Sequence, residues 1–181
     1  DYSVSVERAE EQKKDSAGGG RVHYLQADVR HPPFARGAFD AVYAGAVIHY
    51  TPDARQAFEA LAGVVKADGR MFVSLARRDL PPSAWLKALF IQTMRLFVRR
   101  LPLPATKVVC FGYALAQQGL LRVQHAVGLR KHRKIVPLWA KVRDSFDTFA
   151  TPYYHRHVPA EVESWFRAAG FPAVVDATMP P

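Results

Sequence analysis

A glycine, a histidine and a tyrosine follow a short apolar stretch and form the best candidate for a ligand-binding site in this sequence. Residues 39–44 are apolar apart from Asp40 and partly β-branched or aromatic, which predicts a strand covered on both faces. Gly45 comes directly after it, and a residue without a Cβ lets the backbone approach a ligand closely. His49 and Tyr50 follow, and an imidazole can accept a proton near neutral pH. The alternative is that His49 is a hydrogen-bonded structural residue in an ordinary loop.

The segments around this stretch predict alternating strands and helices. Residues 22–29 predict a short strand that ends near an acid, and residues 70–76 predict a further strand. Residues 54–66 carry an apolar stripe with helical spacing, with Asp53 placed to cap this helix and Gly69 to end it in a left-handed turn. This order predicts an α/β fold, in which ligands bind beyond the carboxyl ends of the parallel strands.

Positive charge is concentrated in one block of the chain. Residues 77–143 hold 14 lysines and arginines but one acid, Asp79, giving +13, whereas the rest of the chain carries −4. Helices are predicted at residues 83–100, with Ser83 as the cap, at 107–126 and at 136–142. The block has three readings: a helical lid with a solvated basic face, helices lying on an anionic membrane, or a nucleic-acid surface.

Several motifs, in order along the chain, resemble those of the class I S-adenosylmethionine-dependent methyltransferases, in particular the type 11 methyltransferase-domain group. The matching segments are Gln26-Ala-Asp28, Pro33-Phe34, Phe39-Asp-Ala-Val42, Val47-Ile-His-Tyr-Thr-Pro-Asp53 and Lys66-Ala-Asp-Gly69. The resemblance covers residues 1–78 and resumes at 146–171, where Pro159–Phe171 is similar to the family's late helix and following strand. It implies a Rossmann-like, mostly parallel sheet and methyl transfer from S-adenosyl-L-methionine to a small-molecule or lipid-like acceptor.

The sequence departs from the family pattern at its start. The glycine-rich loop that cradles the cofactor is absent, and Asp1 is similar to the acid that ends the family's second strand. We therefore expect an N-terminally truncated fragment with an incomplete sheet and weak cofactor binding. Tyr50 stands where the family has a second histidine. A nicotinamide-dependent dehydrogenase would need its own glycine fingerprint, which is absent too.

The resemblance also implies particular site residues. A carboxylate at Asp1 would bind the ribose hydroxyls, and Asp28 with the neighbouring backbone amide would bind adenine. The full set of expected cofactor contacts is Asp1, Tyr2, Asp28, Val29, Ala44, Gly45, Ala46 and His49. The weaker candidates for acceptor binding are Tyr50, Tyr153, Tyr154 and His155. His49 is a weak candidate for a catalytic base, and no metal is expected, since the His155-x-His157 pair has no supporting cysteine or carboxylate cluster.

We expect three parts along the chain. Residues 1–79 would form a partial cofactor-binding core, residues 80–150 a basic helical insertion after the family's fifth strand, and residues 151–181 a return to the core. A single cysteine excludes a disulfide framework, and the longest uncharged stretch, 108–121, is shorter than a bilayer requires. These features predict a cytoplasmic protein, with contact to anionic membranes as one reading of the basic block. The alternative function is a non-catalytic basic module that binds membranes or, as the less favoured partner, nucleic acid.

Overall fold

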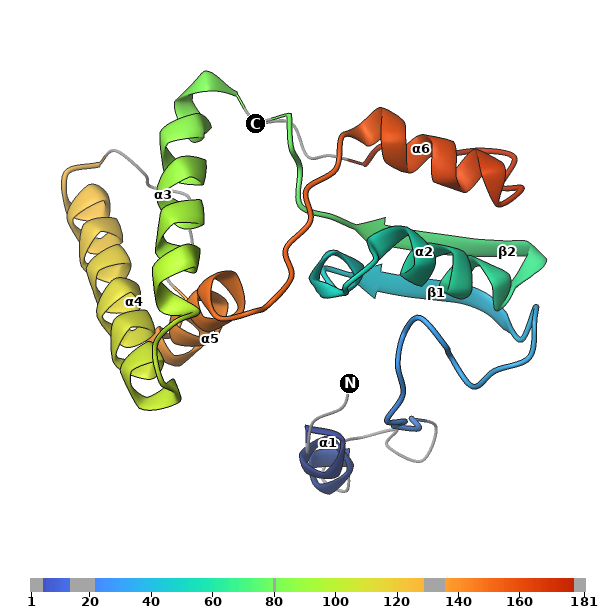
Figure 1. The fold of residues 1–181 in the computed structure, drawn as a ribbon, viewed down its shortest axis with the longest axis horizontal. Coiled ribbons are helices and arrows are strands. Elements are labelled where there is room, and N and C mark those ends of the chain that lie inside the picture. Colours follow the sequence, from blue (N-terminus) through green and yellow to red (C-terminus); the bar gives the residue numbers. More distant parts are fainter. Residues whose placement is uncertain (1–4, 14–21, 80, 129–135, 178–181) are drawn as a thin grey trace. The chain divides into compact units, whose positions relative to one another are not determined.

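The computed structural model describes residues 5–13, 22–79, 81–128 and 136–177. The chain divides into two compact units, unit 1 (residues 1–79 and 155–181) and unit 2 (residues 80–154). The elements of both units are shown in Figure 1. In order they are α1 (Ser5–Lys13), β1 (Phe39–Gly45), the 3-10 helix η2 (Ile48–Tyr50), α2 (Ala54–Gly63), β2 (Val65–Ser74), α3 (Pro82–Val98), α4 (Leu103–Ala126), α5 (Leu138–Phe149) and α6 (Pro159–Ala168).

Unit 1 is built on a parallel pair of strands, which confirms the predicted α/β class. Strands β1 and β2 pair in parallel, with Ala41 opposite Arg70 and Gly45 opposite Ser74. Helices α2 and α6 cover one face of this pair, where Phe58 and Trp165 pack in one core. That core also contains Ala44, Ile48, Ala54 and Ala57, with Met71, Val73 and Phe166 against it.

Among the described residues, the other face of the strand pair is left open, so the prediction of a strand covered on both faces does not hold for them. Tyr43 is 77% exposed there, and its ring stacks on the ring of Phe72 with centroids 4.8 Å apart. The two aromatic rings cover part of each other, as cross-strand pairs do on a solvated sheet face. The apolar sequence of residues 39–44 could not show whether one or both faces of the strand are covered, because small alanines occur among the larger side chains.

Helix α2 begins where its sequence predicted. The Asp53 carboxylate accepts a hydrogen bond of 2.9 Å from the Gln56 amide, which satisfies one of the free amides of the first turn. Ala57 and Phe58 lie fully buried one after the other on the covered side. The helix is shorter than predicted, since it ends at Gly63 and the next residues already belong to β2.

The predicted left-handed turn at Gly69 was also wrong. Gly69 lies within β2, and the register jumps from Phe39 opposite Val65 to Ala41 opposite Arg70. The extra residues form an irregular bulge, in which a Cβ on Gly69 would lie 2.6 Å from Val65 Cγ1 and 2.9 Å from the Asp40 carbonyl oxygen. Glycine is required here by close backbone approach.

Two predicted strands are not formed. Residues 22–28 have no regular secondary structure, although a strand was expected at 22–29. The resemblance also implied a strand after the late helix within Pro159–Phe171, but α6 ends at Ala168 and residues 171–177 have no regular secondary structure. A strand needs a neighbour to satisfy its backbone groups, and in the described part of the chain β1 and β2 pair only with each other. The apolar pattern alone therefore overstated the sheet.

Unit 2 consists of α3, α4 and α5. Its core holds Val98, Cys110 and Phe149, each almost fully buried. Arg95 is 5% exposed and donates hydrogen bonds to the Thr148 and Thr151 carbonyl oxygens, so its buried charge is bound by backbone acceptors. Among the helices that the structure describes, none has the length and apolar character needed to cross a bilayer.

The ends of the unit 2 helices differ from the prediction. Pro81 is the N-cap of α3 and Pro82 lies in its first turn, so Ser83 is not the cap. Proline suits this position because its fixed φ is helical and its missing amide would be unpaired anyway. Helix α4 begins earlier than predicted, at Leu103, and α5 continues to Phe149.

Candidate functional site

The carboxyl ends of β1 and β2 meet at one edge of unit 1. Gly45 and Ser74 are the last residues of the two strands and lie opposite each other. The Ala46 amide donates a hydrogen bond of 3.1 Å to the Ser74 carbonyl, and Ala46 has a φ of +54°. A left-handed alanine costs roughly 1–2 kcal/mol relative to its usual conformation. Such strain often marks a functional turn.

The predicted cofactor contacts at this edge, Ala44, Gly45 and Ala46, are small residues. A Cβ on Gly45 would lie 2.6 Å from Tyr43 Cε1, and Ala44 is 4% exposed beneath it. The Tyr43 ring therefore occupies the space beside Gly45, and packing within the strand pair accounts for the glycine there.

His49 lies immediately below this edge, in η2. It is 4% exposed, and its ring lies 4.2 Å from that of Tyr50, centroid to centroid. Burial lowers the pKa of His49 from 6.5 to about 4, and the positive charges of His157 and His155 act in the same direction, whereas the backbone of Ser74 opposes it. His49 is therefore neutral at pH 7. An imidazole of such a low pKa is a poor proton acceptor, which favours a binding or structural role.

Residues 155–157 cross the same edge in extended conformation. The His155 amide donates a 2.9 Å hydrogen bond to the His49 carbonyl. The His157 amide donates to the Ala76 carbonyl at 2.9 Å, and the Arg78 amide donates to the His157 carbonyl at 2.9 Å. These hydrogen bonds hold residues 155–157 against η2, which follows β1, and against residues 76–78, which follow β2. Both histidines thus reach the edge where ligands bind in parallel sheets.

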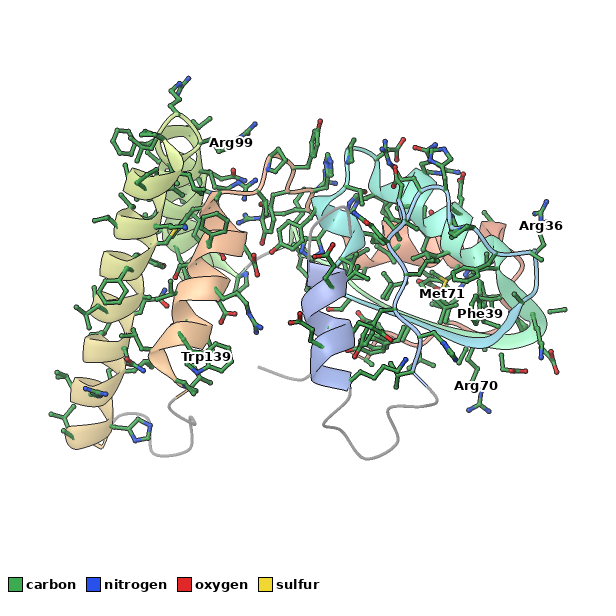
Figure 2. The ribbon with its side chains drawn as sticks, turned by 90° about the horizontal axis from the view of Figure 1, so that it is seen from below. Arg36, Phe39, Arg70, Met71, Arg99 and Trp139 are labelled. Carbon is green, nitrogen blue, oxygen red and sulfur yellow. The ribbon has the colours of Figure 1, made fainter. Side chains whose placement is uncertain are left out.

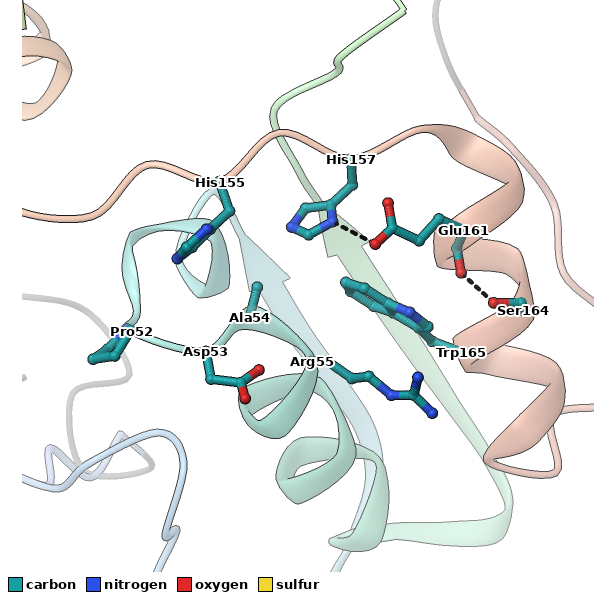
Figure 3. Close-up of a pocket in the computed structure, with 9 residues that line it drawn as sticks. All are labelled: Pro52, Asp53, Ala54, Arg55, His155, His157, Glu161, Ser164 and Trp165. Carbon is teal, nitrogen blue, oxygen red and sulfur yellow. Dashed lines mark hydrogen bonds and ion pairs between the residues drawn. The ribbon is translucent and has the colours of Figure 1, made fainter.

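A pocket of about 340 Å³ opens beside this segment (Figure 3). Its walls are the start of α2, the 155–157 segment and the first turns of α6. In Figure 3, His157 and Glu161 face each other, and the distance from Nδ1 to Oε1 is 3.2 Å. The Trp165 ring meets the His157 ring edge to face, with centroids 4.8 Å apart. The lining residues are Pro52, Asp53, Ala54, Arg55, His155, His157, Glu161, Ser164 and Trp165.

Asp28 and Val29, two further predicted cofactor contacts, lie in the segment before β1. The Asp28 carboxylate is bound by the Arg30 guanidinium, with Nη2 to Oδ2 at 2.7 Å, and it accepts the Arg30 amide at 2.9 Å. A cofactor would have to share or replace these bonds. Val29 packs against the core that contains Ala44, which places this loop on the covered side of β1.

Of the predicted site residues that the structure describes, His155 lines this pocket. Asp1 and Tyr2 lie outside the described residues. Tyr153 and Tyr154 belong to unit 2, where the Arg95 guanidinium lies 4.8 Å from the centre of the Tyr154 ring. Tyr50 remains half-buried next to His49.

Sequence reasoning missed Glu161 as a site residue. Its signal was present, since His157 and Glu161 stand four apart across the start of a helix, the spacing at which side chains meet. In the part of the chain that the structure describes, no group of three or more histidine, cysteine or acidic residues could hold a metal ion.

A parallel strand–helix–strand unit with small residues at its carboxyl edge is typical of α/β domains that bind nucleotide cofactors. Residues 1–73 match the family model of the type 11 group described as "Methyltransferase domain". The match confirms the predicted S-adenosyl-L-methionine-dependent methyltransferase and its cofactor. It ends within β2, and α3 to α6 lie beyond it. A search of curated proteins found no match.

Proposed function

We propose that the methyl acceptor is a small or lipid-like molecule with an ionisable hydroxyl or amine, and that this polar end binds in the pocket beside His157. The observation that carries the proposal is the His157–Glu161 pair at the carboxyl edge. The pocket volume of about 340 Å³ lies at the low end of small-molecule sites. Trp165 offers an apolar wall, and the histidines and Glu161 offer polar groups.

Glu161 gives His157 a defined role. The Glu161 carboxylate lies 3.2 Å from Nδ1 of His157, although the contact does not have hydrogen-bond geometry. Its negative charge would favour a proton on Nδ1, which would leave the lone pair of Nε2 to accept a proton. Nε2 of His157 is buried and has no hydrogen-bond partner within the described residues. A buried polar atom of this kind calls for an explanation, and a hydroxyl or amine of the acceptor supplies one.

The remaining residues orient the reactants and exclude water. S-adenosyl-L-methionine, when bound, supplies an electrophilic methyl group on a positively charged sulfur. The backbone of Ala44–Ala46 would hold it, and Asp28 would exchange bonds with Arg30 to reach it. Nε2 of His157 would take the proton that the acceptor oxygen or nitrogen loses on methylation. Alignment in a dry site supplies much of the rate.

The test is transfer of a tritiated methyl group from S-adenosyl-L-methionine to a series of alkylphenols and alkylamines. His157→Gln and Glu161→Gln should each lower kcat by about 10²-fold or more and leave the KM for the cofactor nearly unchanged. Ser164→Ala is the matched control, since Ser164 lines the same pocket and its hydroxyl donates to the Glu161 carbonyl at 2.6 Å. Unchanged kcat in His157→Gln would refute the assigned role.

A second candidate function is a non-catalytic basic module. The charge of unit 2 favours it, because residues 80–154 hold twelve lysines and arginines against two acids. Under this alternative no labelled product forms with any acceptor. Cys110 is a buried free thiol, which suits a reducing compartment, and we propose the cytoplasm as the site of the reaction.

A further inference from the structure

Helix α3 presents an uncharged apolar face that the described residues of unit 2 leave exposed. Trp85, Leu86 and Leu96 are 62%, 72% and 60% exposed. The opposite side of the helix is buried through Ala88, Arg95 and Val98. Arg95 binds backbone carbonyls, so Lys87 is the one exposed charge on α3 among its described side chains. Exposed apolar surface of this extent marks an interaction site.

Helix α4 repeats the arrangement. Its buried side, with Cys110 and Ala114, packs toward α5. Its outer side exposes Val108 (72%), Leu115 (52%) and Val123 (60%). Gly112 and Gly119 face open space, since a Cβ on either would have no neighbour within 4 Å. Residues 108–121 contain no charged side chain.

Four cations of unit 2 lie at or near the ends of these two helices. Arg99 and Arg100 stand between α3 and α4, Lys107 lies in the first turn of α4, and Arg122 lies in its last turns. All four are exposed. Figure 2 shows Arg99 projecting from the end of α3, and Figure 1 shows α3 and α4 running side by side. The Phe90 and Tyr113 rings, 6.0 Å apart, join the two helices.

We propose that the outer faces of α3 and α4 dock on an anionic membrane surface. Apolar side chains would enter the boundary between headgroups and acyl chains, and the four cations would bind the lipid phosphates and carboxylates. A second copy fits less well, because residues 80–154 carry a net charge of +10 that repels an identical unit. Nucleic acid fits less well too, because the exposed faces are apolar where phosphates would need cations.

The test is flotation of the whole chain with phosphatidylcholine vesicles that contain or lack phosphatidylserine. We expect binding that requires phosphatidylserine and weakens as salt rises. Leu86→Gln with Leu115→Gln should weaken it about tenfold, since two large side chains then lose their burial. Arg99→Gln with Lys107→Gln should weaken it by about tenfold or more. The matched control is Leu25→Gln in unit 1, where the leucine is 51% exposed and no effect is expected.

Several outcomes would overturn the proposal. These are equal binding with and without phosphatidylserine, no flotation, or the same affinity for parent and Leu86→Gln with Leu115→Gln. Self-association that the leucine replacements abolish, without vesicle binding, would assign the faces to a second copy. Binding to single-stranded DNA that the leucine replacements leave unchanged, again without flotation, would assign the unit to nucleic acid. Circular dichroism establishes that each variant is folded. Flotation needs neither cofactor nor turnover, so its failure is separate from failure of the proposed methyl transfer.

Discussion

Acidification should destabilise unit 1 through one residue, His49. Its pKa is lowered from 6.5 to about 4 by burial and by the charges of His157 and His155. The folded state therefore binds fewer protons than the unfolded state between these two values. The stabilisation is fully present above pH 6.5 and is lost as the pH falls toward 4.

The size of the effect follows from the shift. A difference of two to three pKa units corresponds to roughly 3 kcal/mol in total, of which roughly 2 kcal/mol is lost by about pH 5. Such a loss is a large fraction of the stability of an ordinary domain. It applies to unit 1, because His49 and its neighbours all lie there.

The assay is urea unfolding followed by tryptophan fluorescence from pH 8 to pH 5. Trp165 is 5% exposed and lies in unit 1, so a background with Trp85→Phe and Trp139→Phe gives a signal from that unit alone. We expect the free energy of unfolding to fall steeply below pH 6.5 in this background and much less steeply with His49→Gln. His23→Gln, at an exposed histidine, is the control and should keep the parent slope. A parent whose stability is constant over this range, or the same slope with His49→Gln, would refute the reasoning.

Two further substitutions test how unit 1 holds its elements, both by urea unfolding. Asp53→Ala should cost about 1 kcal/mol, because the hydrogen bond from the Gln56 amide is lost, and Asp53→Ser should restore much of it. Gly69→Ala should cost about 2 kcal/mol, because its Cβ would lie 2.6 Å from Val65 Cγ1 and 2.9 Å from a backbone oxygen. Gly63→Ala is the control for the second, since its Cβ meets nothing within 4 Å and should gain about 0.5 kcal/mol. Equal effects of the two glycine replacements would contradict the bulge packing.

Local chemistry made part of the fold predictable. The start of α2 follows from a carboxylate placed three residues before an amide that needs an acceptor, and the structure has that bond. The β1 stretch follows from its apolar run, and the glycine after it marks the end of the strand. Both signals act between residues that are a few positions apart in the sequence. No contact with a distant part of the chain is needed to predict these elements.

Pairing and close approach were not predictable in the same way. Residues 22–28 have the composition of a strand, but no strand lies beside them in the described residues to accept their hydrogen bonds. Asp68-Gly69 is a sequence typical of a helix end. The glycine is instead required by close approach to the carbonyl oxygen of Asp40, which lies in the neighbouring strand. In both places a neighbour distant in sequence decides the local structure. A single sequence does not show that neighbour.

The parts of the proposed sites also differ in whether they could be predicted from local sequence. The elbow from Gly45 to His49 could be predicted because strand, glycine and histidine are contiguous. The pair of His157 and Glu161 acquires meaning only when hydrogen bonds from His155 to His49 and from His157 to Ala76 bring that segment to the strand ends. The exposed faces of α3 and α4 could not be predicted, because apolar side chains occur on all sides of both helices. Their periodicity therefore does not show which side is buried. Packing of α5 against α3 and α4 buries one side of these helices. The side left exposed is apolar, whereas a solvated lid would carry charges there.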